Sequence, residues 1–298
     1  MPRPDDIGKA YEDYYTGNDV GLPPRLRRFA KTLRDVRDSR LQAKLGYPSD
    51  HRLGRGSRLL TVAVLPAIPG LRDAVDDLAC FLPRPQPSAT LLEVGFGSGQ
   101  RMRQMARLGW QVTGVDADPV AVERARKLGL EARLGDLRAQ HFPDGYFHAV
   151  YNSHLLEHVH DPVGFLRECH RVLRPGGTLV TLTPNVSSLG HRRFGEAWFG
   201  LDPPRHLTLF SPTTLRTAVQ RAGFSVVALR TSGRMAPIMW LASSEIVGSS
   251  TGVIPQPEPD RPLPLRDLLI ALRATVMEAG MIAIGRPVGE ELLLVASR

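Results

Sequence analysis

The chain has 298 residues, of which 42% are hydrophobic and 23% charged, so it is long enough to bury a full core and has the composition of a globular protein. No uncharged apolar stretch reaches the roughly 18–20 residues that a membrane-spanning helix needs, and the first residues lack the apolar region of a secretory signal. Two cysteines are too few for a disulfide framework, so we expect a cytoplasmic protein.

The net charge of +8 is concentrated near the N-terminus, where residues 1–60 carry 13 Arg or Lys and 8 Asp or Glu. Such a face can contact nucleic acid, anionic lipid or a phosphorylated substrate, and the alternative is a solvated helix surface. Aromatic residues make up only 6% of the chain, and the sequence has no stacking platform or DNA-reading motif. We therefore expect no nucleic-acid partner, and peripheral membrane contact stays open.

Residues 1–85 are expected to form a helical extension ahead of the core, ended by the proline-rich run PRPQP. Apolar residues recur at helical spacing within residues 22–46, which predicts an amphipathic helix. Tyr11, Tyr14 and Tyr15 precede it on a polar segment. They could form a lid over a bound ligand or simply pack on the core.

Residues 86–232 alternate between short apolar strands and helical segments. The expected strands are 90–94, 111–116, 132–134, 147–152, 177–183 and 225–230, and the expected helices are 100–108, 119–128, 162–173 and 213–222. Strands separated by helices of this length imply βαβ units and a mostly parallel sheet.

The rest of the chain predicts a helical insertion over residues 233–288 and a final core strand within residues 289–298. Two apolar helical stretches flank a proline-rich linker in the insertion, and EELLLVAS reads as the strand. We expect the insertion and the loop at 187–204, which contains Arg192, Arg193 and Trp198, to recognise the acceptor. The alternatives for the insertion are a plain helical cap or a homodimer contact.

The segment LLEVGFGSGQ joins the first core strand to the first core helix and is the predicted cofactor loop. Gly95, Gly97 and Gly99 allow a tight turn and a close approach of the backbone to a ligand. A dinucleotide site favours G-x-G-x-x-G, whereas Gln100 occupies the place of that third glycine. Glu93 would repel a pyrophosphate but suits the ammonium and sulfonium groups of S-adenosylmethionine. The charges therefore favour the methyl donor over NAD.

Two further acids follow the next two strands. Asp116 ends the second strand, where its carboxylate can accept hydrogen bonds from ribose hydroxyls. Asp136 follows the third strand, where it can accept from an adenine amino group, with Leu137 against the ring. Either acid alone could be a helix cap or turn residue, but acids after three successive strands beside a glycine loop predict one site.

The chain also resembles a family, through the ordered motifs LLEVGFGSG, GVDADP, GDLRAQHFPDGYFHAVYNSHLLEHVHDP and LRPGGTLVTLTPN. These look like class I S-adenosylmethionine-dependent methyltransferases of the small-molecule, ubiquinone-type methylase group. The later DPPRHLTLFSPTTLRTAVQRAGFSVV resembles members that accompany glycan or natural-product biosynthesis. The resemblance covers residues 86–232. It implies a Rossmann-like α/β fold with a seven-stranded methyltransferase sheet whose last strand is antiparallel.

By that similarity, several residues are carried over as donor-site residues. They are Glu93, Gly95, Gly97, Asp116, Asp136 and Leu137, with Asn152 near the methionine portion.

His154, Glu157 and His158, in SHLLEHVHDP, come just past the fourth core strand, and His206 follows the fifth. In a helical segment the first three would share one face. His158 and His206 are the candidate general bases, because histidine titrates near neutrality. A structural role is the alternative. Metal binding is a third, less favoured role, since His154 stands where metal-binding relatives have an acid; we assign no metal site.

Together these patterns predict methyl transfer from S-adenosylmethionine to a small-molecule or sugar acceptor, at oxygen, with histidine-assisted deprotonation. The alternatives are methylation at carbon or nitrogen, where a strong base is unnecessary, a nucleic-acid-associated protein, and a non-catalytic S-adenosylmethionine-binding protein.

Overall fold

The structure is a computed structural model that describes residues 40–42, 44–47, 69–249 and 264–298. The three N-terminal tyrosines, most of the expected helix at 22–46 and most of the proline-rich linker lie outside the described residues. In that expected helix, residues 40–42 and 44–45 are helical.

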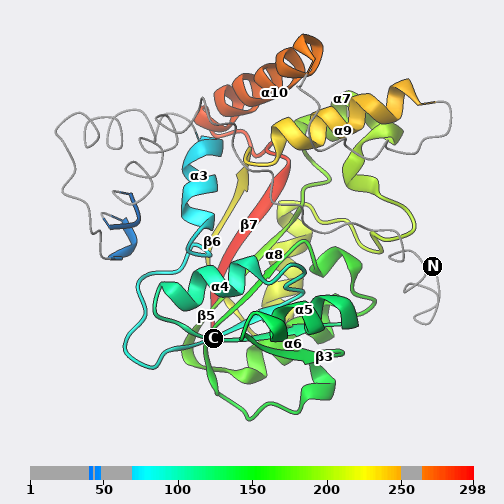
Figure 1. Ribbon diagram of the computed structural model, residues 1–298. Helices are drawn as coiled ribbons and strands as arrows, with labels where there is room; N and C mark the ends of the chain where they lie inside the picture. The colour runs from blue at the N-terminus through cyan, green and yellow to red at the C-terminus, as the bar shows by residue number, and fades with distance from the viewer. Residues whose placement is uncertain (1–39, 43, 48–68, 250–263) are drawn as a thin grey trace.

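The core is a seven-stranded sheet in the order β3-β2-β1-β4-β5-β7-β6, with β7 antiparallel to both of its neighbours (Figure 1). The other pairs are parallel. The strands are β1 (Thr90–Val94), β2 (Gln111–Asp116), β3 (Glu131–Leu134), β4 (Phe147–Ser153), β5 (Leu173–Pro184), β6 (Ser225–Ser232) and β7 (Glu291–Ser297). The expected α/β sheet with an antiparallel last strand is therefore confirmed.

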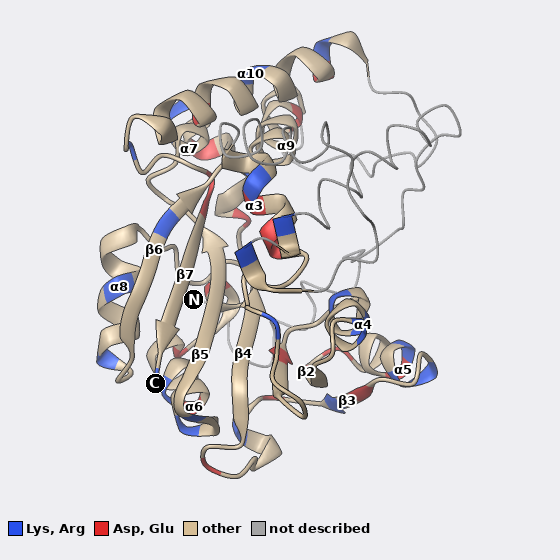
Figure 2. Ribbon diagram, turned by 90° about the vertical axis from the view of Figure 1, so that its left-hand side faces the viewer, with Lys and Arg blue, Asp and Glu red and all other residues tan. Residues whose placement is uncertain are grey.

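Helices cover both faces of the sheet, so the central strands are buried on both sides, as their continuous apolar sequences require (Figure 2). One face packs against α6 and α8, and the other against α4, α5 and the segment that runs from α3 to Leu82. The helices are α3 (Pro69–Asp77), α4 (Gln100–Arg107), α5 (Pro119–Lys127), α6 (Pro162–Val172) and α8 (Pro212–Arg221). Short 3-10 turns are η5 (Arg138–Gln140), η6 (Leu156–His158), η7 (Gly195–Ala197) and η8 (Phe199–Leu201).

Three of these helices begin with the same local signal, a capping side chain followed by proline. Asp118 accepts a hydrogen bond from the Val120 amide at the start of α5, and Asp161 caps α6 through the Gly164 amide. Ser211 forms a reciprocal capping box at the start of α8. Proline at the first helical position costs no hydrogen bond, because the backbone N–H that another residue would have there has no partner within the helix. This signal explains why the predicted starts lie within a residue of the observed ones.

The strand β5 starts earlier than the sequence predicts. The run RPGG, interpreted as the end of the preceding helix, lies inside the strand. Phe147 of β4 pairs with Leu173, but Ala149 pairs with Thr178, so the four residues between them form an irregularity in β5. Glycines at 176 and 177 make this bulge sterically accessible.

In the described part of the predicted insertion before the last strand lie two helices, α9 (Ala236–Gly248) and α10 (Leu265–Ala283). They pack on each other and on α7 (Leu189–Phe194) and α3. In Figures 1 and 2 these helices lie above one end of the sheet. We call α7, α9 and α10 the cap. Within the described ranges, no helix is long and apolar enough to cross a bilayer.

A pair of buried carboxyl groups joins the cap to the core. Glu278 of α10 accepts a hydrogen bond from the amide of Glu290, which precedes β7, and Trp240 Nε1 lies 3.1 Å from a carboxylate oxygen of each acid. Trp198 Nε1 and the Gly190 amide donate to the Glu290 carboxylate at 2.7 Å. Burial beside Glu290 raises the pKa of Glu278 to about 9, so the neutral acid is the form that the folded cap favours.

Glu278 therefore predicts a loss of stability in alkali. A pKa raised in the folded state contributes stability in full below the ordinary value of 4.5, and this contribution disappears as the pH rises through about 9. In thermal unfolding from pH 6 to 10, Glu278→Gln should lose less stability than the unsubstituted protein as the pH rises from 6 to about 9. The exposed Glu245→Gln on α9 is the control. Equal alkaline losses in all three proteins would contradict this role.

Candidate active site

The loop between β1 and α4 has the conformation that its glycines predict. Gly95, Gly97 and Gly99 have φ of 73°, 52° and 72°, a region that other residues rarely adopt. The Gly95 amide donates to the Val115 carbonyl at 2.8 Å, which joins the loop to β2. The remaining backbone of the loop curves over the carboxyl ends of the strands, where ligands of open α/β sheets bind.

Two buried polar side chains lie beside this loop, on neighbouring strands. Val94 pairs with Asn152 and Glu93 with Tyr151, so Glu93 and Asn152 both lie at the carboxyl ends of their strands, and their side chains leave opposite faces of the sheet. Among the described residues, Glu93 Oε2 and Asn152 Oδ1 have no hydrogen-bond partner, whereas Asn152 Nδ2 donates to Thr181. Buried acceptors without donors are costly and rare, so both atoms indicate a ligand that donates hydrogen bonds.

Burial raises the pKa of Glu93 to about 8, and Arg101 nearby opposes this shift. A cation placed against Glu93 would stabilise the carboxylate. The site therefore has the chemistry to accept an ammonium group, and it has little capacity for a second anion.

The acids after β2 and β3 are both at the same edge. Asp116 accepts the amides of Gly97 and Asp118 at 2.8 and 2.9 Å, so it ties the glycine loop to the end of β2. Each of its oxygens keeps a further lone pair for a ligand hydroxyl. Asp136 is exposed and accepts the Arg138 amide, while Leu137 is buried in the hydrophobic core.

Past β4 the chain forms the 3-10 turn η6 rather than the regular helix on which the expected shared face depended. Even so, Glu157, His158 and His206 converge, with one ligand-type atom from each within 4.8 Å of the others. The two imidazole rings meet edge to face with centroids 4.7 Å apart. His206 comes from the loop after η8, as the sequence predicts.

Backbone carbonyls fix the two rings of this cluster. His158 Nδ1 lies 3.0 Å from the Arg205 carbonyl oxygen, and His206 Nδ1 lies 2.7 Å from that of Gly200. A neutral ring that donates from Nδ1 has its lone pair on Nε2. Burial lowers the pKa of His158, and Glu157 only partly offsets this effect, so the neutral ring is favoured near pH 7.

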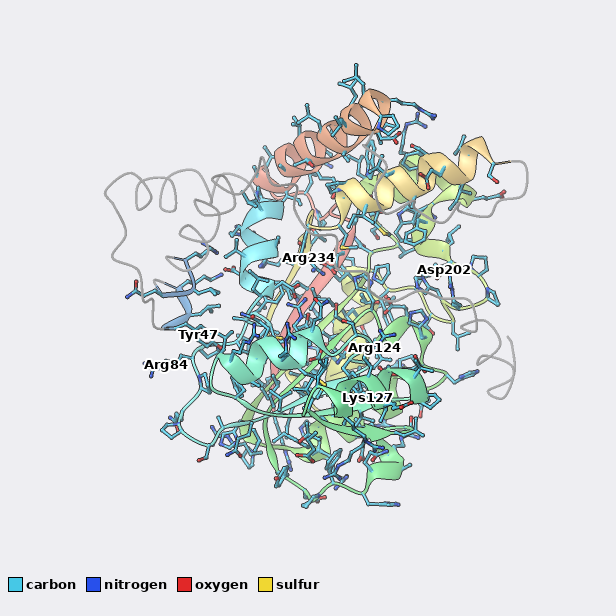
Figure 3. The ribbon with its side chains drawn as sticks, in the orientation of Figure 1. Tyr47, Arg84, Arg124, Lys127, Asp202 and Arg234 are labelled. Carbon is cyan, nitrogen blue, oxygen red and sulfur yellow. The ribbon has the colours of Figure 1, made fainter. Side chains whose placement is uncertain are left out.

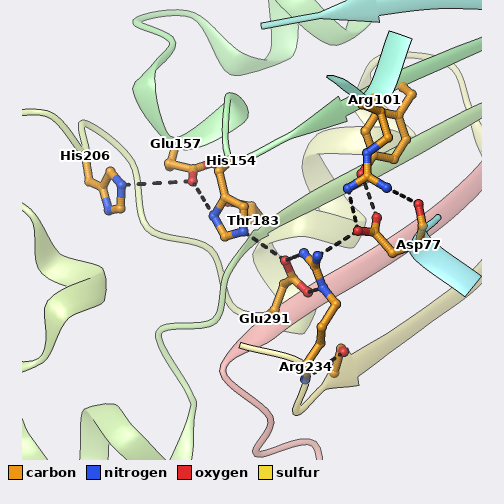
Figure 4. Close-up of polar contacts among 10 residues, drawn as sticks. Asp77, Arg101, His154, Glu157, Thr183, His206, Arg234 and Glu291 are labelled. Carbon is orange, nitrogen blue, oxygen red and sulfur yellow. Dashed lines mark hydrogen bonds and ion pairs between the residues drawn. The ribbon is translucent and has the colours of Figure 1, made fainter. Parts of the chain in front are cut away.

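His154 is held differently, between two carboxylates (Figure 4). Its Nε2 lies 2.9 Å from Glu291 Oε1, and its Nδ1 lies 3.4 Å from Glu157 Oε1. Burial alone would lower the pKa of His154, but Glu157 and Glu291 outweigh it and raise the pKa to about 10. His154 is thus a fixed imidazolium. Its backbone also has a φ of 52°, which is strained for a residue with a side chain.

A ladder of alternating charges continues from His154 into the fold. Arg234, labelled in Figure 3, donates to both Glu291 oxygens at 2.6 and 3.1 Å and to Asp77 at 2.7 Å. Asp77 also accepts from Arg101 at 2.6 Å and from the Tyr151 hydroxyl at 2.8 Å. We call these groups, from Glu157 through His154, Glu291, Arg234 and Asp77 to Arg101, the charge ladder. It connects the histidine cluster to the neighbourhood of Glu93.

The sequence patterns identified Glu157 and His154 at one end of this ladder but missed its other members, including Arg101 at the far end. Asp77, Arg234 and Glu291 come from α3, the turn after β6 and the start of β7, and no local motif connects them. Trp198, expected near the acceptor, is instead buried against Glu290.

Comparison with known proteins identifies the family of the chain. A sequence model of the methyltransferase domain matches residues 69–229. The ubiquinone biosynthesis O-methyltransferase of Xanthomonas campestris pv. campestris (strain B100) is 43% identical over 106 residues, which cover 33% of this chain and 44% of that protein. The protein of the same name from Maricaulis maris (strain MCS10) is 30% identical over 172 residues, which cover 53% of this chain and 68% of that protein. The chain thus spans less than half of the Xanthomonas protein.

Among solved structures, geranyl diphosphate methyltransferase in complex with SAM superposes with a TM-score of 0.51, covering 86% of this chain and 94% of that chain at 20% sequence identity. This likeness supports the fold alone. Together with the domain match and the glycine loop, the observations give one conclusion: the chain belongs to the methyltransferase domain family.

Proposed function

We propose that this protein transfers the methyl group of S-adenosylmethionine to a hydroxyl oxygen of a small-molecule or sugar acceptor. The observation that carries the proposal is the convergence of Glu157, His158 and His206 past the end of β4, together with the unpartnered buried atoms of Glu93 and Asn152 at the carboxyl ends of β1 and β4. The names of the curated relatives, ubiquinone biosynthesis O-methyltransferases, favour oxygen as the methylated atom.

The donor pocket is built from groups that suit a cationic nucleoside. Glu93 would accept from the ammonium group, Asn152 would contact the methionine portion, and Asp116 would accept from the ribose hydroxyls. Asp136 would contact the adenine amino group. When bound, S-adenosylmethionine supplies a methyl group that an acceptor oxygen can displace from sulfur. The glycine loop and the strand ends fix its orientation, and alignment of the two reactants can account for roughly 7–11 kcal/mol of the barrier.

The histidine cluster would handle the proton that the acceptor loses. His158 in its Nδ1–H tautomer can take the hydroxyl proton at Nε2, and Glu157 stabilises the imidazolium that results. His206 is the second candidate for the same role. Methylation at carbon or nitrogen would not need this cluster as a base, which is why we propose oxygen as the methylated atom.

A specific observation also favours a second role for the cluster. Two imidazoles that each donate Nδ1–H to a backbone carbonyl fit a divalent cation, together with the buried Glu157 Oε1, which has the ion pair to His154 but no hydrogen bond among the described residues. Such an ion would polarise the acceptor hydroxyl and lower its pKa. His154 would not be a ligand, because both of its ring nitrogens face carboxylates.

Transfer of isotopic label tests the proposal. The protein is incubated with methyl-labelled S-adenosylmethionine and a panel of phenols, sugars, amines and carbon nucleophiles, before and after treatment with a chelator. We expect label on a hydroxyl acceptor. Activity that resists chelation supports histidine as base, and activity lost to chelation and restored by a divalent cation supports the metal role. Label confined to amines or carbon acceptors would overturn O-methylation, and donor binding without any transfer would favour a non-catalytic binding protein.

Asp116→Ala should weaken donor binding by about 1–3 kcal/mol, because ribose hydroxyls would lose a half-buried acceptor. Calorimetry measures the dissociation constant, and circular dichroism checks that the fold survives. Asp118→Ala is the matched control, since Asp118 caps α5 but is exposed and has no proposed contact with S-adenosylmethionine. An Asp116→Ala protein that binds the donor with unchanged affinity would remove Asp116 from the site.

A further inference from the structure

The outer face of α10 is apolar and exposed. Leu265, Leu269, Leu272 and Val276 recur at spacings of three and four, so they share one side of the helix, and they are 73%, 57%, 60% and 61% exposed. Leu268 beside them is 50% exposed. The opposite side of α10 carries the buried Ala274 and Glu278 and packs against α9 and α3. A row of leucines on the solvent side of a helix marks a contact surface.

The exposed charged residues of α10 are all basic. Arg266 and Arg273 are exposed and seven residues apart, so they line one flank of the leucine row, and the exposed Arg286 follows the helix. The acids of the helix are Asp267, which is partly buried, and Glu278, which is buried. Figure 2 shows α10 at the extreme end of the molecule, with basic residues along it. Leucines bordered by arginines are the pattern of a helix that lies in the interface of an anionic bilayer.

The size of the face argues against a second copy of the chain as its partner. A helix of 19 residues is about 28 Å long and presents a face about 10 Å wide, or roughly 300 Å². A stable protein interface buries about 800 Å² on each partner. A symmetric contact along this row would also bring the arginines of one copy near those of the other.

We propose that α10 is a membrane-surface helix, which docks the protein on an anionic lipid bilayer through the leucine row and the flanking arginines. The leucine side chains would reach about 5–10 Å into the boundary between head groups and acyl chains, with the helix axis parallel to the surface. The arginines would add attraction to anionic head groups. This inference is independent of the proposed reaction.

Docking would also bring the histidine cluster near the lipid. Gly200 in η8 holds the His206 ring through its carbonyl, η8 packs on α9, and α9 packs on α10. Only α9 and η8 therefore lie between the surface helix α10 and the His206 ring along this chain of contacts.

Vesicle co-sedimentation of the full chain tests the proposal, with vesicles of phosphatidylcholine alone and of phosphatidylcholine with phosphatidylglycerol. We expect binding to the anionic vesicles. Leu268→Ser/Leu269→Ser/Leu272→Ser should lower the partition coefficient at least about tenfold. Arg266→Gln/Arg273→Gln should lower it about fivefold per arginine and reduce its dependence on salt.

The matched control is Val120→Ser/Val227→Ser, which removes side chains that are 60% and 67% exposed on α5 and β6. It should bind like the unsubstituted protein, and all variants should keep the same melting temperature, because their sites are exposed. Absence of binding, or binding that the leucine variant leaves unchanged, would overturn the proposal. A dimer by light scattering that the leucine variant converts to a monomer would overturn it in favour of a second copy.

Discussion

Replacement of His158 by asparagine is expected to reduce turnover about 10²–10⁴-fold while leaving donor affinity unchanged. The ring is fixed by the Arg205 carbonyl, lies beside the carboxylate of Glu157 and is positioned to accept a proton at Nε2. Burial lowers its pKa below the ordinary value of 6.5. The rate should therefore rise with pH through a value below 6.5 and then level off, because the neutral ring is the active form.

The pH profile separates this role from a structural one. His158→Asn should lose the acidic limb, whereas the exposed His160→Asn, two residues further along the chain, should keep both the limb and the rate. The measurement is turnover of an identified acceptor at saturating donor from pH 5 to 9. A folded His158→Asn enzyme with near-normal turnover would refute the assignment.

Glu291→Ala is expected to be the most destabilising single substitution in the charge ladder. The side chain is fully buried and holds both His154 and Arg234, so its removal leaves His154 with only Glu157 and Arg234 with only Asp77 as a partner carboxylate. Breaking a buried ion pair in this way costs about 3–5 kcal/mol. Denaturant unfolding measures the loss. Glu291→Gln, which keeps a hydrogen-bond acceptor, should cost less.

The loss should depend on pH in a defined way. Burial would raise the pKa of Glu291, but Arg234 and His154 outweigh it and lower the pKa to about 2, so its stabilisation is complete above 4.5 and disappears as the pH falls through about 2. His154, with a pKa raised to about 10, stabilises fully below 6.5 and loses its effect as the pH rises through about 10. The deficit of Glu291→Ala should peak between pH 4.5 and 6.5.

An exposed pair provides the control for this prediction. Glu131→Gln breaks the contact with Arg133 on the surface and should change stability by about 0–1 kcal/mol. A Glu291→Ala deficit as small as that of Glu131→Gln would mean that the ladder does not stabilise the fold.

Local signals explain why most of the sheet could be predicted. The sequence predicts the strand Gln111–Asp116 with its observed bounds, because Gly109 lies two residues before it and a capping Asp-Pro pair follows it closely. The glycine loop was predicted because its backbone needs residues that tolerate positive φ. The early start of β5 could not be predicted, since RPGG is a helix stop by composition and becomes a bulge only through pairing with β4.

The charge ladder could not be predicted for a topological reason. Glu291 reads as the first residue of an apolar strand, and its position depends on that strand being antiparallel. Because β7 runs antiparallel, its first residue, Glu291, pairs with Pro184 at the carboxyl end of β5 and with Ser232 at the carboxyl end of β6. Glu291 therefore lies at the end of the sheet where the proposed cofactor site is. Conversely, Leu137 was expected at the adenine ring, and the structure shows it in the hydrophobic core.

Calorimetric titration with S-adenosylmethionine and with NAD tests the central claim most directly. The unpartnered oxygen of Glu93, the glycine loop and Asp116 predict saturable binding of S-adenosylmethionine near neutral pH. Binding of NAD should be negligible, because Gln100 occupies the place of the third glycine of a dinucleotide loop. Measurable affinity for NAD without any response to S-adenosylmethionine would contradict the account.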